Sequence, residues 1–126
     1  MFREIPNINI FKNTKEEVLN YYNNNSYIID EKKKEKGEVF TPIHLVEKML
    51  DKFPNDVWTN PDLKWLDNSA GMGAFPICVF YRLMDGLKDT ITDEDERKRW
   101  IIKKMLYMVE LDKNNCDILE QIFNFD

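Results

Sequence analysis

The sequence predicts an α/β fold in which a small parallel sheet is flanked by helices. Two short apolar segments, "LKWLD" (residues 63–67) and "LYMVEL" (residues 106–111), have the length of buried strands, and a helical pattern follows each. Strands that alternate with helices favour parallel pairing through crossover connections. With 126 residues, of which 43% are hydrophobic and 33% charged, the chain has the size and composition of one globular domain.

A first helix is expected near the N-terminus. In "NTKEEVLNYYNNN" (residues 13–25), Thr14 and Glu17 have the spacing of a capping box. We expect this helix to end in its asparagine run. The charge run "DEKKKEKGE" (residues 30–38) that follows is typical of a solvated loop.

A second helix is expected in "TPIHLVEKMLDKF" (residues 41–53). Thr41 is the expected N-cap and Pro42 the expected first helical residue, because proline tolerates that position and threonine can accept a backbone N–H. One apolar face is predicted for this helix, formed by Leu45, Val46, Met49 and Leu50.

Three further helices surround the expected strands, over residues 74–87, 92–106 and 112–125. The first is apolar throughout, which predicts a buried helix, and Gly86 is placed to end it. Thr92 and Asp112 are the expected N-caps of the other two. The last helix has an apolar stripe formed by Ile118, Leu119 and Ile122.

A glycine-rich turn, "LDNSAGMGAF" (residues 66–75), follows the first expected strand. Gly71 and Gly73 can adopt backbone angles and close approaches that a side chain would block. Parallel α/β sheets bind ligands at the carboxyl ends of their strands, and Asp67 and Glu110 are acids at those two ends. An acid in such a place can hold the hydroxyls of a ribose.

Two kinds of nucleotide-containing ligand, a dinucleotide such as NAD and a ligand without a pyrophosphate, are compatible with this geometry. The dinucleotide fingerprint needs a small residue where this chain has Pro76, and it expects the ribose acid about 20 residues beyond the glycines, whereas Glu110 lies much further along. Both departures weaken the interpretation as an NAD site. A ligand without a pyrophosphate, such as S-adenosylmethionine, does not need a glycine-rich helix start for phosphate.

Three segments, taken in order, resemble motifs of adenine-N6 DNA methyltransferases from restriction-modification systems. They are "GEVFTP" (residues 37–42), "LDNSAGMGAF" (residues 66–75) and "VELD" (residues 109–112). The resemblance covers residues 37–126 and implies a partial Rossmann-like S-adenosylmethionine-dependent methyltransferase fold. Residues 1–36 would then form an N-terminal helical extension and charged loop.

The resemblance also implies S-adenosylmethionine as the cofactor and assigns residues to its pocket. Phe40 and Thr41 would line the pocket, Glu110 would bind the ribose hydroxyls and Leu111 would pack on the adenine. The pocket floor would be formed by Asp67, Ser69, Ala70, Gly71 and Gly73. No metal is implied, and the spacing of the two cysteines and single histidine does not favour a zinc site.

A later motif of this family, Asn or Asp followed by Pro, Pro and Tyr or Phe, holds the extruded adenine and stacks on it. No such tetrapeptide occurs here, and "NPDL" (residues 60–63) lacks the second proline and the aromatic residue, so no catalytic residue is assigned. We therefore expect the N-terminal, cofactor-binding part of a larger enzyme, inactive as an isolated chain. DNA would be contacted through a C-terminal part or a partner chain, which fits a net charge of −5.

Two alternatives stay open. A two-stranded sheet leaves edges and apolar faces unpaired, so the chain could be a non-catalytic interaction module completed by self-association or by a complementing subunit. It could also be part of a methyltransferase that acts on a substrate other than DNA. No apolar run is long enough to span a bilayer and no secretory signal is present, so we expect a cytoplasmic protein.

Overall fold

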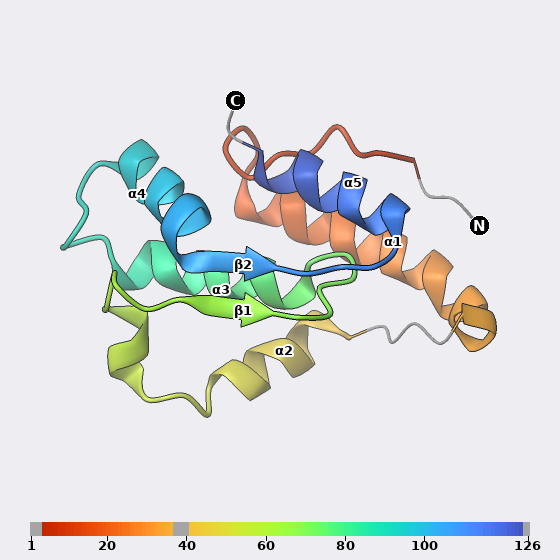
Figure 1. Ribbon diagram of the computed structural model, residues 1–126, viewed down its shortest axis with the longest axis horizontal. Helices are drawn as coiled ribbons and strands as arrows, with labels where there is room; N and C mark the ends of the chain where they lie inside the picture. The colour runs from red at the N-terminus through yellow and green to blue at the C-terminus, as the bar shows by residue number, and fades with distance from the viewer. Residues whose placement is uncertain (1–3, 37–40, 125–126) are drawn as a thin grey trace.

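Helices and two short strands alternate along the chain in the order that the sequence predicts (Figure 1). The computed structural model describes residues 4–36 and 41–124, and the side chains of residues 4–25 and 41–124. The elements are α1 (Lys15–Lys36), α2 (Ile43–Leu50), the 3₁₀ turn η1 (Asn55–Trp58), β1 (Trp65–Asp67), α3 (Ala74–Gly86), α4 (Glu94–Trp100), the π-helical segment η2 (Ile101–Met105), β2 (Leu106–Met108) and α5 (Lys113–Phe123).

The two strands pair in parallel, as predicted. Trp65 lies opposite Leu106 and Leu66 lies opposite Tyr107, so Leu66 and Tyr107 belong to the same face of the sheet. Helix α3, which belongs to the crossover between the strands, lies behind the sheet in Figure 1. The class is therefore α/β, with a small parallel sheet and a larger helical part.

The core gathers around α3, which is buried as its apolar sequence predicts. Ile77, Phe80 and Leu83 are fully buried on this helix. The predicted apolar stripe of α5 is confirmed, since Ile118, Leu119 and Ile122 are all buried. The predicted face of α2 is only half right: Val46 and Leu50 are buried, whereas Leu45 and Met49 are exposed. A short helix that packs on one neighbour buries a narrower stripe than its sequence offers.

Helix caps agree with the sequence at two ends. The capping box at the start of α1 is formed, with the Thr14 N–H 2.8 Å from Glu17 Oε1 and the Glu17 N–H 3.2 Å from Thr14 Oγ1. Asp112 caps α5, because its Oδ1 accepts the Asn115 N–H at 3.0 Å.

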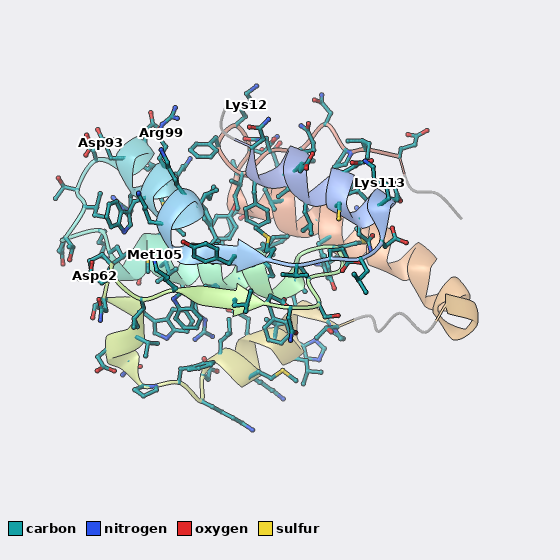
Figure 2. All side chains as sticks on the ribbon, in the orientation of Figure 1. Lys12, Asp62, Asp93, Arg99, Met105 and Lys113 are labelled. Atoms are coloured by element: carbon teal, nitrogen blue, oxygen red, sulfur yellow. The ribbon has the colours of Figure 1, made fainter. Side chains whose placement is uncertain are left out.

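Two other expected caps are shifted by one residue. Asp93, not Thr92, caps α4, where its Oδ1 accepts the Glu96 N–H at 2.8 Å (Figure 2). Pro42, not Thr41, occupies the N-cap position of α2, with φ of −61° and ψ of 144° and no side-chain cap. An extended backbone at Pro42 delays the first helical turn to Ile43.

Helix α1 is longer than predicted. It continues through the asparagine run and through residues 30–36 of the charge run, which we expected to be a loop, and it ends at Lys36. Lysine and glutamate are good helix formers, so a charged stretch with no helix-breaking residue can extend a helix that has already nucleated. The last two residues of the charge run lie outside the described residues.

The segment before α1 packs on α5. The buried side chain of Asn9 donates from Nδ2 to the carbonyl oxygens of Gln121 (2.8 Å) and Asn124 (2.6 Å). Beside it, the Ile10 N–H donates to the Ile122 oxygen at 2.8 Å. These bonds join the first and last described segments of the chain. The predicted domain boundary after residue 36 stays a prediction.

Gly86 ends α3, as predicted, but the reason for glycine there is a backbone contact. A Cβ at this position would lie 2.1 Å from the carbonyl oxygen of Trp58 in η1. The Trp58 ring in turn stacks on Trp65 of β1, with ring centroids 4.7 Å apart. Gly86 therefore lets η1 approach α3 while Trp58 packs against the sheet.

We expect Gly86→Ala to destabilise the chain by about 1–3 kcal/mol, as overpacking does when the contacted atom is backbone and cannot move aside. In an exposed helical position the same change would stabilise by about 0.5–1 kcal/mol. Urea unfolding measures the difference. Asp85→Ala, at the exposed neighbouring position, is the control and should change stability little. A Gly86→Ala chain as stable as the wild type would contradict the close η1 contact.

Asn9→Ala should cost about 1–3 kcal/mol of unfolding free energy, because it removes the buried donor of two carbonyl groups on α5. Thermal and urea unfolding measure this loss. Asn20→Ala, an exposed asparagine of α1, serves as the matched control and should leave the stability unchanged or slightly raised. Equal stabilities for the two variants would mean that the N-terminal segment does not dock on α5.

Candidate cofactor site

The turn after β1 lies beside the segment that follows β2. The Val109 N–H donates to the backbone carbonyl oxygen of Asp67 at 2.9 Å, and the Ala70 N–H donates to the backbone carbonyl oxygen of Val109 at 3.1 Å. These two bonds continue the parallel ladder beyond the strands. In Figure 1 both arrows end on the side where these segments lie. Residues from two of the three sequence motifs therefore meet at the carboxyl ends of the strands, where α/β sheets bind ligands.

One hydrogen bond joins the glycine turn to the acid after β2. The Gly71 N–H donates to Glu110 Oε1 at 2.7 Å. Gly71 has φ of +56°, a left-handed conformation that favours glycine. Apart from its two chain neighbours, no heavy atom of the described residues lies within 4 Å of the position that a Cβ would take. The backbone angle favours glycine here, and the space beside it is open.

Gly73 faces the protein interior instead. It has φ of +94° and precedes α3, and a Cβ there would lie 3.0 Å from Leu119 Cδ2 on α5. Its N–H donates to the Ala70 oxygen at 2.8 Å, which closes the turn. Gly73 thus allows α5 to pack on the start of α3, and its predicted role in the pocket floor stays a prediction.

Asp67 and Ser69 shape the beginning of the turn. Asp67 Oδ1 accepts the Ser69 N–H at 3.0 Å, the bond that aspartate commonly makes two residues ahead in a turn. Asp67 is half-buried, Ser69 is exposed and Ala70 is buried. An ionised carboxylate can accept about four hydrogen bonds, so Asp67 retains acceptor capacity for a ligand.

Glu110 is held from the side of α5 as well. Its Oε2 accepts the Asp112 N–H at 3.0 Å and lies 3.4 Å from Asn115 Nδ2. Cys116 Sγ lies 3.1 Å from the Glu110 carbonyl oxygen. Leu111, which follows directly, is 99% exposed. The site therefore presents an oriented carboxylate next to an apolar side chain that has no cover within the described residues.

The remaining predicted residues are those before α2. The backbone carbonyl oxygen of Thr41 accepts a hydrogen bond from the Tyr22 hydroxyl at 2.8 Å, which connects this segment to α1. In the view of Figure 1, α2 begins at the end of the molecule where the strands end. Phe40 lies outside the described residues.

Two hollows adjoin the two acids. One, of about 510 Å³, includes Glu110 in its wall, together with Met108, Cys116, Leu119, Glu120, Phe123 and Asn124. The other, of about 260 Å³, reaches Asp67 and is lined mostly by apolar side chains of β1, α3 and β2. The larger hollow falls within the range of small-molecule sites.

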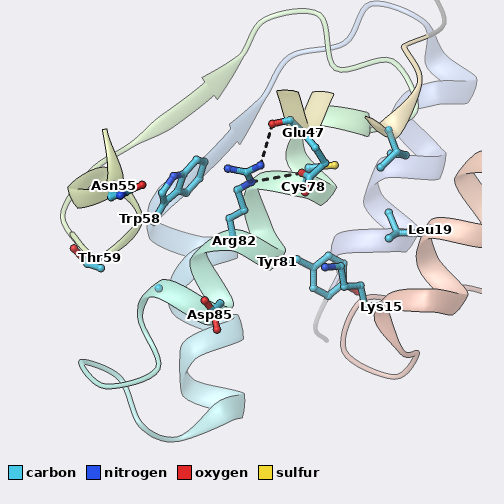
Figure 3. A pocket seen from close by; sticks show the side chains of 12 residues that line it. Lys15, Leu19, Glu47, Asn55, Trp58, Thr59, Cys78, Tyr81, Arg82 and Asp85 are labelled. Carbon is cyan, nitrogen blue, oxygen red and sulfur yellow. Dashed lines mark hydrogen bonds and ion pairs between the residues drawn. The ribbon is translucent and has the colours of Figure 1, made fainter. Parts of the chain in front are cut away.

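A further cavity, of about 570 Å³, lies between α1, α2, η1 and α3 and contains none of the predicted site residues (Figure 3). The side chain of Arg82 lies across this cavity. Its Nη2 donates to Asp51 Oδ1 at 2.7 Å and to the backbone carbonyl oxygen of Glu47 at 2.9 Å, and its guanidinium lies over the Trp58 ring. Burial, assisted by the Glu47 carboxylate, raises the pKa of Cys78 to about 12. This thiol therefore stays protonated at neutral pH and is a poor nucleophile.

The two cysteines, Cys78 and Cys116, are free, and Cys78 is buried. Within the described ranges, no three His, Cys, Asp or Glu side chains are grouped so that they could hold a metal ion. The helices of those same ranges also include none that is long and apolar enough to cross a bilayer.

Asn115 is a site residue that the sequence did not predict. It is 2% exposed and lies on the first turn of α5, beside the Glu110 carboxylate. Its only signal in the sequence is its place three residues after the helix cap Asp112, where its backbone N–H, rather than its side chain, is expected to matter.

No family model matches this chain, and no solved structure matches it. Among curated proteins, one from Mycoplasma pneumoniae (strain ATCC 29342 / M129 / Subtype 1), described as an uncharacterized adenine-specific methylase, is 47% identical over 79 residues. The match covers 60% of this chain and 19% of that relative, so the chain spans about a fifth of the relative's length. Over the matched residues, the resemblance to adenine methyltransferases that the three motifs predict is confirmed.

Proposed function

We propose that this chain is the S-adenosylmethionine-binding part of a DNA adenine-N6 methyltransferase of a restriction-modification system. The observation that carries the proposal is the bond between the Gly71 N–H and Glu110 Oε1, because it joins two sequence motifs at the strand ends. The similarity to a protein described as an adenine-specific methylase supports the same reaction class. The parallel pairing and the order of the elements are compatible with a partial Rossmann-like domain.

The residues present fit such a cofactor. Glu110 and Asp67 would accept hydrogen bonds from ribose hydroxyls and from amino groups, which are the donors that S-adenosylmethionine carries. Gly71 leaves open space for close approach of the ligand to the backbone. The exposed side chain of Leu111 would cover one face of the adenine.

The bound cofactor would supply an activated methyl group on its sulfonium sulfur. Within the complete enzyme the acceptor would be an adenine amino nitrogen, and the rate would depend mainly on holding that nitrogen in line with the methyl carbon. The residues of this chain would bind and orient the cofactor. The groups that hold the adenine and grip the DNA would come from a C-terminal part or a partner chain.

Calorimetric titration with S-adenosylmethionine tests the proposal. We expect micromolar binding by the intact chain and about 10- to 100-fold weaker binding by Asp67→Ala and Glu110→Ala, the loss that follows when a charged hydrogen-bond partner is removed. Asp95→Ala, an exposed acid of α4, should bind like the wild type.

Circular dichroism and thermal unfolding of each variant separate lost binding from lost structure. Absence of binding by the folded intact chain would overturn the proposal.

A second candidate function is a non-catalytic interaction module, and the uncovered face of the sheet favours it. Leu66 is 69% exposed and its register partner Tyr107 is 43% exposed. Val109, just beyond β2, is also exposed. Three neighbouring apolar side chains on one face of a two-stranded sheet form a surface that association could bury.

Sedimentation measurements over a range of concentrations test self-association through this face. If a second copy covers it, the intact chain should dimerise, and Leu66→Lys and Tyr107→Lys should shift the equilibrium to monomer because a buried unpaired charge is costly. Thr90→Lys, an exposed position away from the sheet face, is the control. A chain that is monomeric at every concentration would exclude self-association by this surface.

A further inference from the structure

We propose that Asn115 is a positioning residue of the proposed cofactor site, because it fixes the orientation in which the Glu110 carboxylate receives a ligand. The inference rests on the proposed function, in which Glu110 binds the ribose hydroxyls. Neither the family resemblance nor the sequence pattern assigns this role to Asn115.

The position of Asn115 is unusual for an asparagine side chain. It is 2% exposed, on a helix whose other buried residues are Ile118, Leu119, Ile122 and Phe123. Burying an amide is costly unless it makes hydrogen bonds. Its Nδ2 lies 3.4 Å from Glu110 Oε2, and its own backbone N–H is held by Asp112 Oδ1 at 3.0 Å. The cap thus fixes the residue that in turn contacts Glu110.

The Glu110 carboxylate accepts hydrogen bonds both from the glycine turn and from the start of α5. Oε1 accepts the Gly71 N–H at 2.7 Å, whereas Oε2 accepts the Asp112 N–H at 3.0 Å and faces Asn115 Nδ2. A glutamate side chain that is free to rotate loses conformational entropy when it binds a ligand. A carboxylate already held between the glycine turn and α5 avoids much of that loss.

The chemistry of the asparagine suits this role. An amide donates to the carboxylate without adding a charge that would compete with the ligand. Leucine is larger but has the same branching at Cγ and no donor, and aspartate has the same shape but would place a second carboxylate beside Glu110. Asn115→Leu and Asn115→Asp therefore remove the donor in two different ways.

Hydrogen exchange of the Gly71 amide, measured by NMR without any cofactor, tests the positioning directly. Asn115→Leu should lower the protection of this amide about fivefold or more, because loss of one hydrogen bond to a charged group is worth a change of that size. Asn115→Asp should lower it at least as much. Asn20→Leu, at an exposed position of α1, should leave it unchanged. Wild-type protection of Gly71 in both folded Asn115 variants would overturn the inference.

A double-mutant cycle in S-adenosylmethionine affinity tests whether Asn115 acts through Glu110. We expect Asn115→Leu to weaken binding about five- to tenfold in the wild-type background and to have no further effect in the Glu110→Ala background. An equal loss in both backgrounds would show a general structural role and overturn the inference. If the intact chain binds no S-adenosylmethionine, the proposed function fails, while the Gly71 exchange still decides the role of Asn115.

Discussion

The hydrogen bond between the Gly71 N–H and the Glu110 carboxylate is the contact on which the candidate site depends. It connects the turn after β1 to the segment after β2, and the backbone bonds of Asp67 and Ala70 with Val109 hold the same two segments in parallel register. Gly71 also has a left-handed backbone angle, which favours glycine at this turn. Two motifs that are about forty residues apart in sequence thereby form one surface.

Helix α3 supports this surface because both of its ends accept a close neighbour. At its start, Gly73 leaves room for Leu119 of α5, and at its end Gly86 leaves room for the backbone of η1. Since α5 also carries Asn115 and begins at the Asp112 cap, the packing of α5 on α3 places the groups that orient Glu110. Core packing and the geometry of the site are therefore coupled through one helix.

The uncovered sheet face and the candidate cofactor site lie on neighbouring parts of the same two strands. Leu66 and Tyr107 are exposed on the sheet, and Val109 and Leu111 continue the exposed apolar surface toward the strand ends. A segment or subunit that covered this face would also border the proposed pocket. Cofactor binding in the methyltransferase proposal and partner binding in the interaction-module proposal would thus use adjoining surfaces of the molecule.

Local patterns in the sequence by themselves determined the order of the elements, the parallel pairing, the capping box at Thr14, the cap at Asp112 and the placement of one acid at or just beyond the end of each strand. Each of these depends on residues that are close together in the chain or on strand and helix periodicity. Only the tertiary structure decided that Leu45 and Met49 remain exposed, that Gly86 faces the Trp58 carbonyl, and that Asn115 contacts Glu110. Most of these outcomes depend on which distant segment packs against a given side chain, and a periodic pattern does not specify that partner.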